Sequence, residues 1–120
     1  KYSAPQNSII MFTEQLNKVE LVGTVGSVAV NRVGDKKNVR LSLATEYSYR
    51  DSAGNAIVEV TWHNITGWEG PAVSGLEDIS KGDRLHVIGR LRQFRFTSSD
   101  GTERTVYEVI ASRLEKVTGR

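Results

Sequence analysis

The chain has 120 residues, of which 38% are hydrophobic and 25% charged, a composition that predicts a single globular domain and excludes a disordered chain. No apolar run approaches the roughly 18 residues of a membrane span, and cysteine is absent, which excludes a membrane helix, disulfides and a thiolate metal site. The formal net charge of +2 points to no partner, so the distribution of charges is more informative.

The N-terminal segment and the first strand are predicted from polarity and alternation. Residues 1–10 are expected to form a flexible leader or a vector-derived remnant, with one domain spanning residues 11–120 and starting near Met11. Residues 18–23 alternate apolar and polar side chains, and the pattern continues past Gly26. This predicts a first strand that bends or bulges at its glycines.

Two turn signals separate the next strands. Residues 31–38 contain a Gly-Asp-Lys-Lys turn, after which residues 39–44 alternate as a second strand. Residues 51–55 form another polar turn, and the alternation resumes at residues 58–63. The pattern predicts a long hairpin with a polar tip.

The last part of the chain predicts a short helix and a closing hairpin. Residues 72–79 carry apolar side chains at helical spacing, and residues 81–83 form a turn. Alternating residues 85–97 lead to a turn at residues 98–101, and residues 105–114 form the last strand. About five strands with one short helix between the third and fourth indicate an all-β protein with the five-stranded Greek-key barrel of the OB fold, a fold that binds oligonucleotides.

Several motifs in this order resemble the single-stranded DNA-binding (SSB) family of bacteria and mitochondria, over about residues 16–117. The motifs are the opening strand Asn17 to Gly26, Leu43-Ala44-Thr45, Thr61-Trp62-His63, Lys81-Gly82-Asp83, Gly89-Arg90-Leu91-Arg92, and Asp100-Gly101 before the strand that bears Tyr107. The resemblance implies sequence-independent binding and protection of single-stranded DNA during replication, recombination and repair. It also implies a place at the nucleoid in the bacterial cytoplasm.

Binding single-stranded DNA without reading its sequence requires flat rings for the bases and cations for the phosphates. The resemblance assigns base stacking to Tyr49, Trp62, Trp68 and Phe96, and Tyr47 is an additional platform on the same face as Tyr49. The family commonly has Trp at the positions of Tyr49 and Phe96, and Phe at the position of Trp68. Because each stacked base contributes about 1–3 kcal/mol, these exchanges are not expected to abolish binding.

Each aromatic residue also has a structural alternative, since large rings in small barrels usually belong to the core. Trp62 shares the alternation of the two valines before it, which favours the core, whereas its family position favours DNA. Tyr49 and Phe96 lie beside polar hairpin tips, and Trp68 follows a glycine in a loop-like stretch. We therefore expect these three side chains to be exposed.

Cations gather near the aromatic positions, with five arginines and Lys81 between residues 81 and 104. The predicted phosphate-binding residues are Arg40, Arg50, Arg90, Arg92, Arg95, Lys36 and Lys37. For Arg40, Lys36 and Lys37, plain solvation is an equal alternative. Since each neutralised phosphate of a single strand adds about 0.7 to the salt slope, binding is expected to weaken markedly with salt.

The two histidines, His63 and His86, have no acidic pair, activated nucleophile or metal-ligand cluster near them in sequence. The chain is therefore not expected to be an enzyme or to bind a metal or cofactor. The resemblance implies a homotetramer or a dimer, assembled through the first strand and the face of His63, with Val19 and Leu21 in the interface.

Other functions remain open at this point. An OB domain can serve as a protein-interaction module, and stacking with phosphate contacts does not separate RNA from DNA. A nucleic-acid enzyme or an anticodon-binding appendage would need a second domain, which 120 residues do not hold. Bacterial family members typically continue into an acidic-ended tail that recruits replication and repair proteins. This sequence stops at Thr118-Gly119-Arg120, so such partners are expected only if that tail exists.

Overall fold

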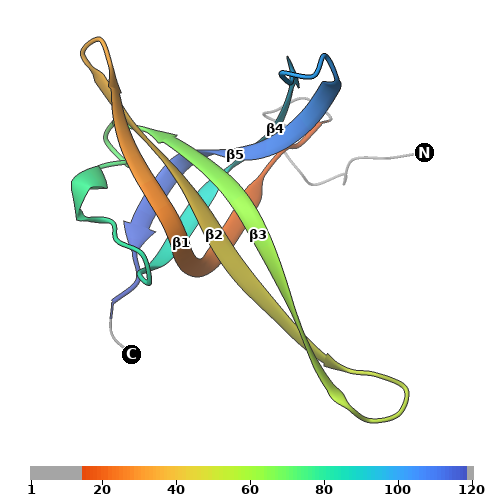
Figure 1. The fold of residues 1–120 in the computed structure, drawn as a ribbon. Coiled ribbons are helices and arrows are strands. Elements are labelled where there is room, and N and C mark those ends of the chain that lie inside the picture. The colour runs from red at the N-terminus through yellow and green to blue at the C-terminus, as the bar shows by residue number, and fades with distance from the viewer. Residues whose placement is uncertain (1–14, 119–120) are drawn as a thin grey trace, which may run out of the picture.

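The structure is a computed structural model that describes residues 15–118. It contains the strands β1 (Val19–Val33), β2 (Lys36–Arg50), β3 (Ala56–Trp68), β4 (Arg84–Thr97) and β5 (Glu103–Lys116), and a single 3-10 turn, η1 (Leu76–Asp78) (Figure 1). The all-β class and the short helical element between the third and fourth strands are thus confirmed. The predicted leader and the start of the domain near Met11 lie outside the described residues.

The strands form a closed barrel in the order β1-β2-β3-β5-β4, with β4 returning to β1. The neighbours are antiparallel except β3 and β5, which pair in parallel from Ile65 opposite Val109 to Gly67 opposite Ala111. This is the predicted Greek-key OB barrel, because the connection through η1 carries the chain across the barrel between β3 and β4. Among residues 15–118, no helix has the length and apolar character needed to cross a membrane.

The core follows from the two-residue period of the strands, which sends alternate side chains into the barrel. On β2, Val39, Leu41 and Leu43 are buried, whereas Arg40 between them is exposed. The other strands and the η1 segment complete the core with Val25, Ile65, Val73, Leu76, Ile79, Leu85, Val87, Val109, Ala111 and Leu114.

Two glycines allow the strands to approach closely where the barrel closes. A Cβ atom at Gly89 would lie 2.1 Å from the carbonyl oxygen of Ile110, and one at Gly23 would lie 2.3 Å from that of Ala44. Any side chain at either position would collide with backbone, so these glycines are required by packing. The ladders break near both sites, between Val25 and Ser27 and next to Gly89, as bulged strands do where they bend.

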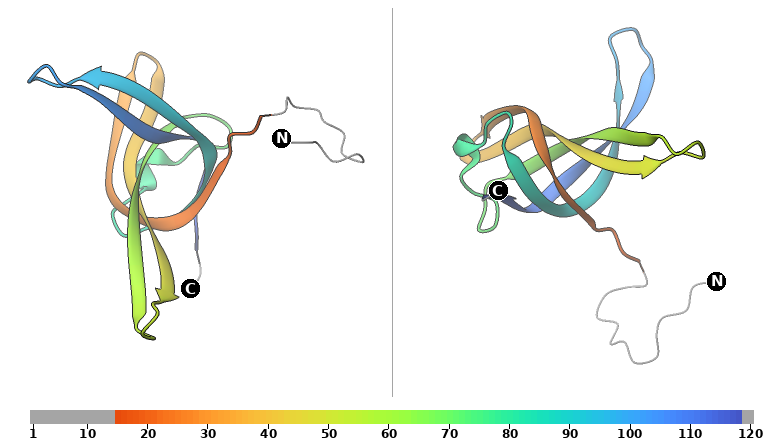
Figure 2. Two further views of the ribbon diagram at one scale, coloured as in Figure 1. Left: turned by 90° about the vertical axis from the view of Figure 1, so that its right-hand side faces the viewer. Right: turned by 90° about the horizontal axis from the view of Figure 1, so that it is seen from below.

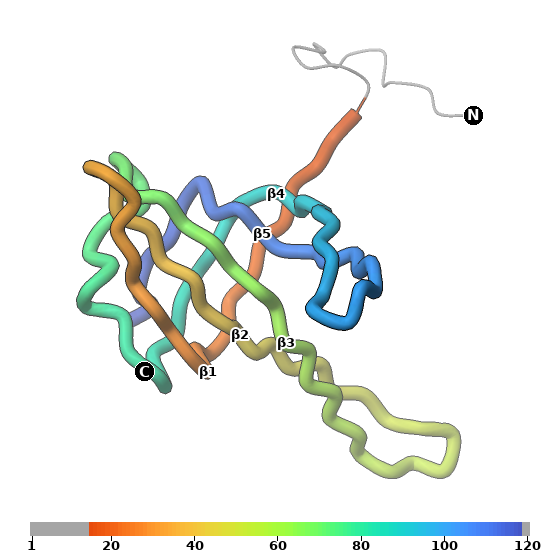
Figure 3. The backbone as a smooth tube through the Cα atoms, turned by 45° about the horizontal axis from the view of Figure 1, so that its top comes forward, coloured from red at the N-terminus to blue at the C-terminus, as the bar shows by residue number. Residues whose placement is uncertain are grey.

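The β2–β3 and β4–β5 hairpins extend beyond the barrel (Figures 2 and 3). Beyond Ala44, β2 pairs only with β3, and we call residues 45–61 the β2–β3 arm. Residues 92–108 form the β4–β5 arm, where β4 no longer pairs with β1. In Figure 3 both arms extend to the same side of the barrel. Their side chains have no further layer to pack against, which leaves much of each arm exposed.

Candidate nucleic-acid interface

Trp62 and Trp68 lie on the outer surface of β3. The side chain of Trp62 is 60% exposed and that of Trp68 41%, and Asn64 and Thr66 alternate between them on the same strand face. The alternative that placed Trp62 in the core is therefore wrong for this chain. Alternation shows which side chains share a face, but the face of Trp62 and its preceding valines is not covered by another sheet or helix.

Tyr47 and Tyr49 lie on the other face of the β2–β3 arm. Tyr47 is opposite Glu59 and Tyr49 opposite Ile57, whereas the partners of the Trp62 face are the residues in between. The two tyrosine rings are 5.9 Å apart between centroids, and the Tyr49 hydroxyl donates to Glu59 Oε2 at 3.3 Å. Both rings are exposed, so the arm presents aromatic surface on both faces.

Phe96 lies near the tip of the β4–β5 arm, as Tyr49 lies near the tip of the β2–β3 arm, and is exposed. It alternates with Arg92 and Phe94 on one face of β4, and the Arg92 guanidinium lies 5.2 Å from the centroid of the Phe94 ring. A guanidinium over an aromatic face is held by the ring quadrupole. All five aromatic side chains that the sequence predicted for base stacking are thus exposed in this structure.

The predicted phosphate-binding residues do not form one continuous row. Arg40 and Arg92 line the same groove, and Arg90 lies two residues before Arg92 on β4. Arg95 alternates to the opposite face of the β4–β5 arm and pairs with Glu103 at 3.5 Å.

The remaining cations have local partners or lie at a tip. Arg50 donates to the carbonyl oxygen of Gly54 at 2.7 Å, which closes the tip of the β2–β3 arm. Lys37 forms an ion pair with Glu77 of η1, which also lowers the pKa of that carboxyl group. Lys36 is exposed at the β1–β2 hairpin. Lys36 is therefore the better placed of the two lysines to meet an external anion.

A groove runs between the outer surface of β2 and β3 and the root of the β4–β5 arm. It consists of two adjoining hollows of about 300 Å³ and about 240 Å³, and both are lined by Arg40, Thr66, Phe94 and Glu108. Thr66 and Glu108 were not among the residues predicted from the sequence. A polar residue at an outward strand position looks the same in sequence whether it faces solvent or lines a groove.

The predicted interface residues lie at the other side of the barrel and near the base of the arm. His63 is partly buried on the inner side of β3, where its Nε2 lies 2.8 Å from Thr45 Oγ1, and burial lowers its pKa. Val19 and Leu21 pack against the core from β1. The side chains that β1 turns outward there are Glu20 and Val22.

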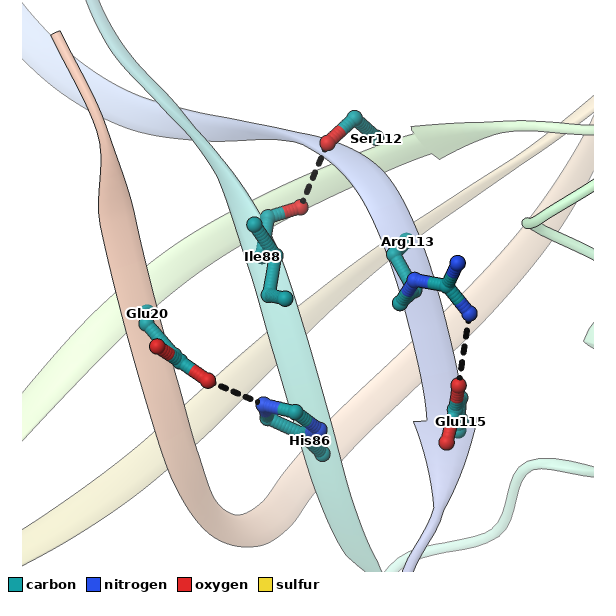
Figure 4. A network of polar contacts seen from close by, with 6 residues as sticks. All are labelled: Glu20, His86, Ile88, Ser112, Arg113 and Glu115. Atoms are coloured by element: carbon teal, nitrogen blue, oxygen red, sulfur yellow. Dashed lines mark hydrogen bonds and ion pairs between the residues drawn. The ribbon is translucent and has the colours of Figure 1, made fainter.

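The outer surface of β1, β4 and β5 carries a polar network (Figure 4). Glu20 of β1 pairs with His86 of β4 at 2.7 Å, and Arg113 pairs with Glu115 along β5 at 2.9 Å. The Ser112 hydroxyl of β5 donates to the carbonyl oxygen of Ile88 of β4 at 3.1 Å, beside the bulge in the β4–β5 ladder. Within residues 15–118, no three acidic or histidine side chains gather into a metal site.

The closed Greek-key barrel with two exposed aromatic arms defines an OB-fold protein. The model of the Single-strand binding protein family matches residues 16–117. The chain therefore belongs to the Single-strand binding protein family.

Known relatives and structures agree with this membership. The chain is similar to the single-stranded DNA-binding protein of Neisseria meningitidis serogroup B, with 31% identity over 107 residues that cover 88% of this chain and 62% of that protein. Its match to the Rickettsia felis protein is 33% identical over 99 residues, covering 79% and 65%. The chain thus spans less than two thirds of the length of these relatives.

Two solved structures are also similar. The Plasmodium falciparum SSB in complex with ssDNA has a TM-score of 0.77 and 27% identity, covering 90% of this chain and 100% of that one. A deletion mutant of the single-stranded DNA-binding protein from Thermus aquaticus has a TM-score of 0.70 at 23% identity, covering 88% of this chain and 52% of that one. The second similarity shows the fold alone.

Proposed function

We propose that this chain binds single-stranded DNA without strong sequence preference, by stacking bases on exposed rings and neutralising phosphates with arginines. The observation that carries this proposal is the exposure of Tyr47, Tyr49, Trp62, Trp68 and Phe96 around the β2–β3 arm, the outer surface of β3 and the β4–β5 arm. Gathered exposed apolar side chains on a soluble protein commonly mark an interaction site. The relatives are named single-stranded DNA-binding proteins, and the similar Plasmodium protein is bound to ssDNA. Both facts support DNA as the partner.

The path of the strand follows from the two-faced β2–β3 arm. Tyr47 and Tyr49 face one side and Trp62 the other, so one DNA strand that meets all three must pass around the edge of the arm. From Trp62 the outer surface of β3 leads to Trp68, beside the groove with Arg40. At about 1–3 kcal/mol for each stacked base, three or four platforms are sufficient for strong binding even with the ring exchanges noted above.

We further propose the biological setting that the family implies. The chain protects single strands in replication, recombination and repair, in the cytoplasm of a bacterium and at its nucleoid, and binds without catalysing a reaction. It assembles as a homotetramer or dimer through β1 and the face near His63. Because the predicted interface residues Val19 and Leu21 turn towards the core, the β1 side chains available to a second copy are Glu20 and Val22. Replication and repair proteins are partners only of a form that carries an acidic tail.

Titration of intrinsic tryptophan fluorescence with oligothymidylate tests the proposal. Two single-tryptophan variants report on separate places. Trp68→Phe keeps only Trp62, at the root of the β2–β3 arm, and Trp62→Phe keeps only Trp68, beside the groove. Strong quenching that weakens between low and high salt is the expected result, because stacking quenches the indole and phosphate contacts release counterions. Correct folding without quenching or binding would overturn it and favour a protein-interaction module. Tighter binding of oligouridylate would favour RNA instead.

A further inference from the structure

Two polar side chains that line the groove are buried, and base stacking on the exposed rings does not involve them. Glu108 is 8% exposed and Asn38 is 7% exposed, yet both line the 240 Å³ hollow together with Trp68, Arg92 and Phe94. Both are placed at outward positions of their strands, so they are buried by the groove walls and not by the barrel core. Burying polar groups at such a position requires hydrogen-bond partners.

The hydrogen-bond partners available within the described residues do not saturate these acceptors. Glu108 Oε1 accepts from the Thr66 hydroxyl at 2.8 Å, while Oε2 lies 3.6 Å from Arg92 Nη1, beyond a direct hydrogen bond. Each carboxylate oxygen can accept two hydrogen bonds, so acceptor capacity is left over. The side-chain oxygen of Asn38 is itself shielded from solvent and has no hydrogen-bond partner within residues 15–118, so the accessible acceptor capacity belongs to Glu108. The Glu108 carboxylate thus keeps spare acceptor capacity at the hollow, which favours a ligand that brings an N–H donor.

The walls of the hollow favour a planar ligand. Trp68 lies directly across the β2–β3 ladder from Asn38, and Phe94 lines the hollow from β4 with the Arg92 guanidinium over its ring. Two aromatic rings in the lining and a carboxylate acceptor at the hollow are features of a pocket for one aromatic heterocycle. Arg40 at the same hollow supplies a cation for the phosphate that accompanies a nucleotide.

We propose that this hollow binds one nucleobase with an exocyclic amino group, cytosine, adenine or guanine, whose N–H₂ donates to Glu108. Thymine presents carbonyl oxygens where these bases carry the amino group, and an oxygen would face the carboxylate without a proton between them. The proposal deepens the proposed function and rests on it. The other stacking platforms read no base edge, so a single preferred position is compatible with weak overall sequence dependence.

The test compares an oligothymidylate of about 15 nucleotides, within the usual site sizes of OB folds, with the same oligonucleotide carrying one central cytosine. The wild-type chain is expected to bind the cytosine-containing strand about three- to tenfold more tightly, as one charge-assisted base contact allows. In Glu108→Gln the ratio is expected to fall to about one or to invert, because the new amide donates to the oxygens of thymine.

The control separates this effect from net charge. Glu115→Gln changes the charge equally on the same strand but lies outside the groove, paired with Arg113, and should keep the wild-type ratio. If Glu108→Gln fails to fold, NMR of the wild-type Asn38 side-chain amide replaces it. That signal should shift more with the cytosine-containing strand than with oligothymidylate.

Two results would overturn the proposal. Equal affinity of the wild-type chain for both oligonucleotides would show that no base edge is read. A change in Glu108→Gln that affects both strands equally, together with a smaller salt slope, would show that Glu108 only orients Arg92. In either case oligothymidylate still binds and the proposed function stands, whereas failure to bind either strand would overturn both.

Discussion

The indole ring of Trp62 on β3 lies over Gly26 of β1, across the intervening strand β2. A Cβ atom at Gly26 would come within 2.4 Å of Trp62 Cζ3 and 2.8 Å of Cη2. The absent side chain therefore leaves room for the ring at the root of the β2–β3 arm. An exposed ring is usually mobile, but this one is held against backbone, which prepares it for stacking at a smaller entropic cost.

Gly26→Ala is expected to displace the Trp62 ring and to weaken oligothymidylate binding by about 1 kcal/mol, the lower end of one stacking contact. The reduction should appear in the Trp68→Phe background as weaker quenching of the remaining indole. Gly70→Ala is the matched control, since a Cβ there would meet only the Trp68 carbonyl oxygen at 3.9 Å, an ordinary contact. Equal binding of the two alanine variants would contradict the role of Gly26.

Arg92 and Lys37 should differ in their effect on salt dependence. Arg92 faces the groove, and Arg92→Gln is expected to reduce the salt slope of single-strand binding by about 0.7, the value for one phosphate. Arg92 lies 3.6 Å from Glu108 but its side chain is 48% exposed, whereas the Lys37 side chain is only 19% exposed and is bonded to Glu77, so Lys37→Gln should change the slope by much less. Affinities measured over a series of salt concentrations check both values. A larger effect for Lys37 than for Arg92 would show that the ion pair opens for DNA.

Apolar side chains of the core and of the β2–β3 arm should differ in their contribution to stability. Leu43 is fully buried in the barrel, and Leu43→Ala is expected to cost about 2–5 kcal/mol in the free energy of unfolding. Val58 is 57% exposed on the arm, so Val58→Ala should change stability by no more than about 0.5 kcal/mol. Urea unfolding followed by circular dichroism measures both. A large loss for Val58→Ala would mean that the arm packs against something in solution, such as a second copy.

Asp100 at the tip of the β4–β5 arm predicts a stabilisation that disappears in acid. Hydrogen bonds from the Ser98 hydroxyl and the Thr102 backbone N–H lower the pKa of its carboxyl group from 3.8 to about 2. A lowered pKa stabilises the folded state above pH 3.8, and this contribution is lost as the pH falls from about 4 towards 2.

Replacing Asp100 by Asn should therefore reduce the loss of stability over this pH range. Urea unfolding at pH 5 and at pH 2.5 compares the variant with Asp35→Asn, a control at the tip of the β1–β2 hairpin. NMR titration of the Asp100 carboxyl group gives its pKa directly. An acid dependence unchanged in Asp100→Asn, or a carboxyl group that titrates near 4, would contradict the assignment.

The sequence by itself determined the barrel. Alternation with a period of two, glycines at the bends and polar turns placed the strands and the short helical element, because the pleat makes burial depend on sequence parity. The residues flanking the polar tips, Tyr49 and Phe96, were also predictable as exposed for this reason. The family motifs added the positions of Trp62 and Trp68.

Only the tertiary structure decided which faces are covered and which distant side chains meet. Trp62 shares its parity with valines and could belong to the core by pattern alone, but its face of the arm has no second layer. Parity puts Arg92 and Arg95 on opposite faces of β4, but only the tertiary structure shows that Arg92 lines the groove whereas Arg95 pairs with Glu103. The groove of Asn38, Thr66 and Glu108 arises from β2, β3 and β5. Its residues become neighbours only through the parallel pairing of β3 with β5, a contact between segments far apart in the chain.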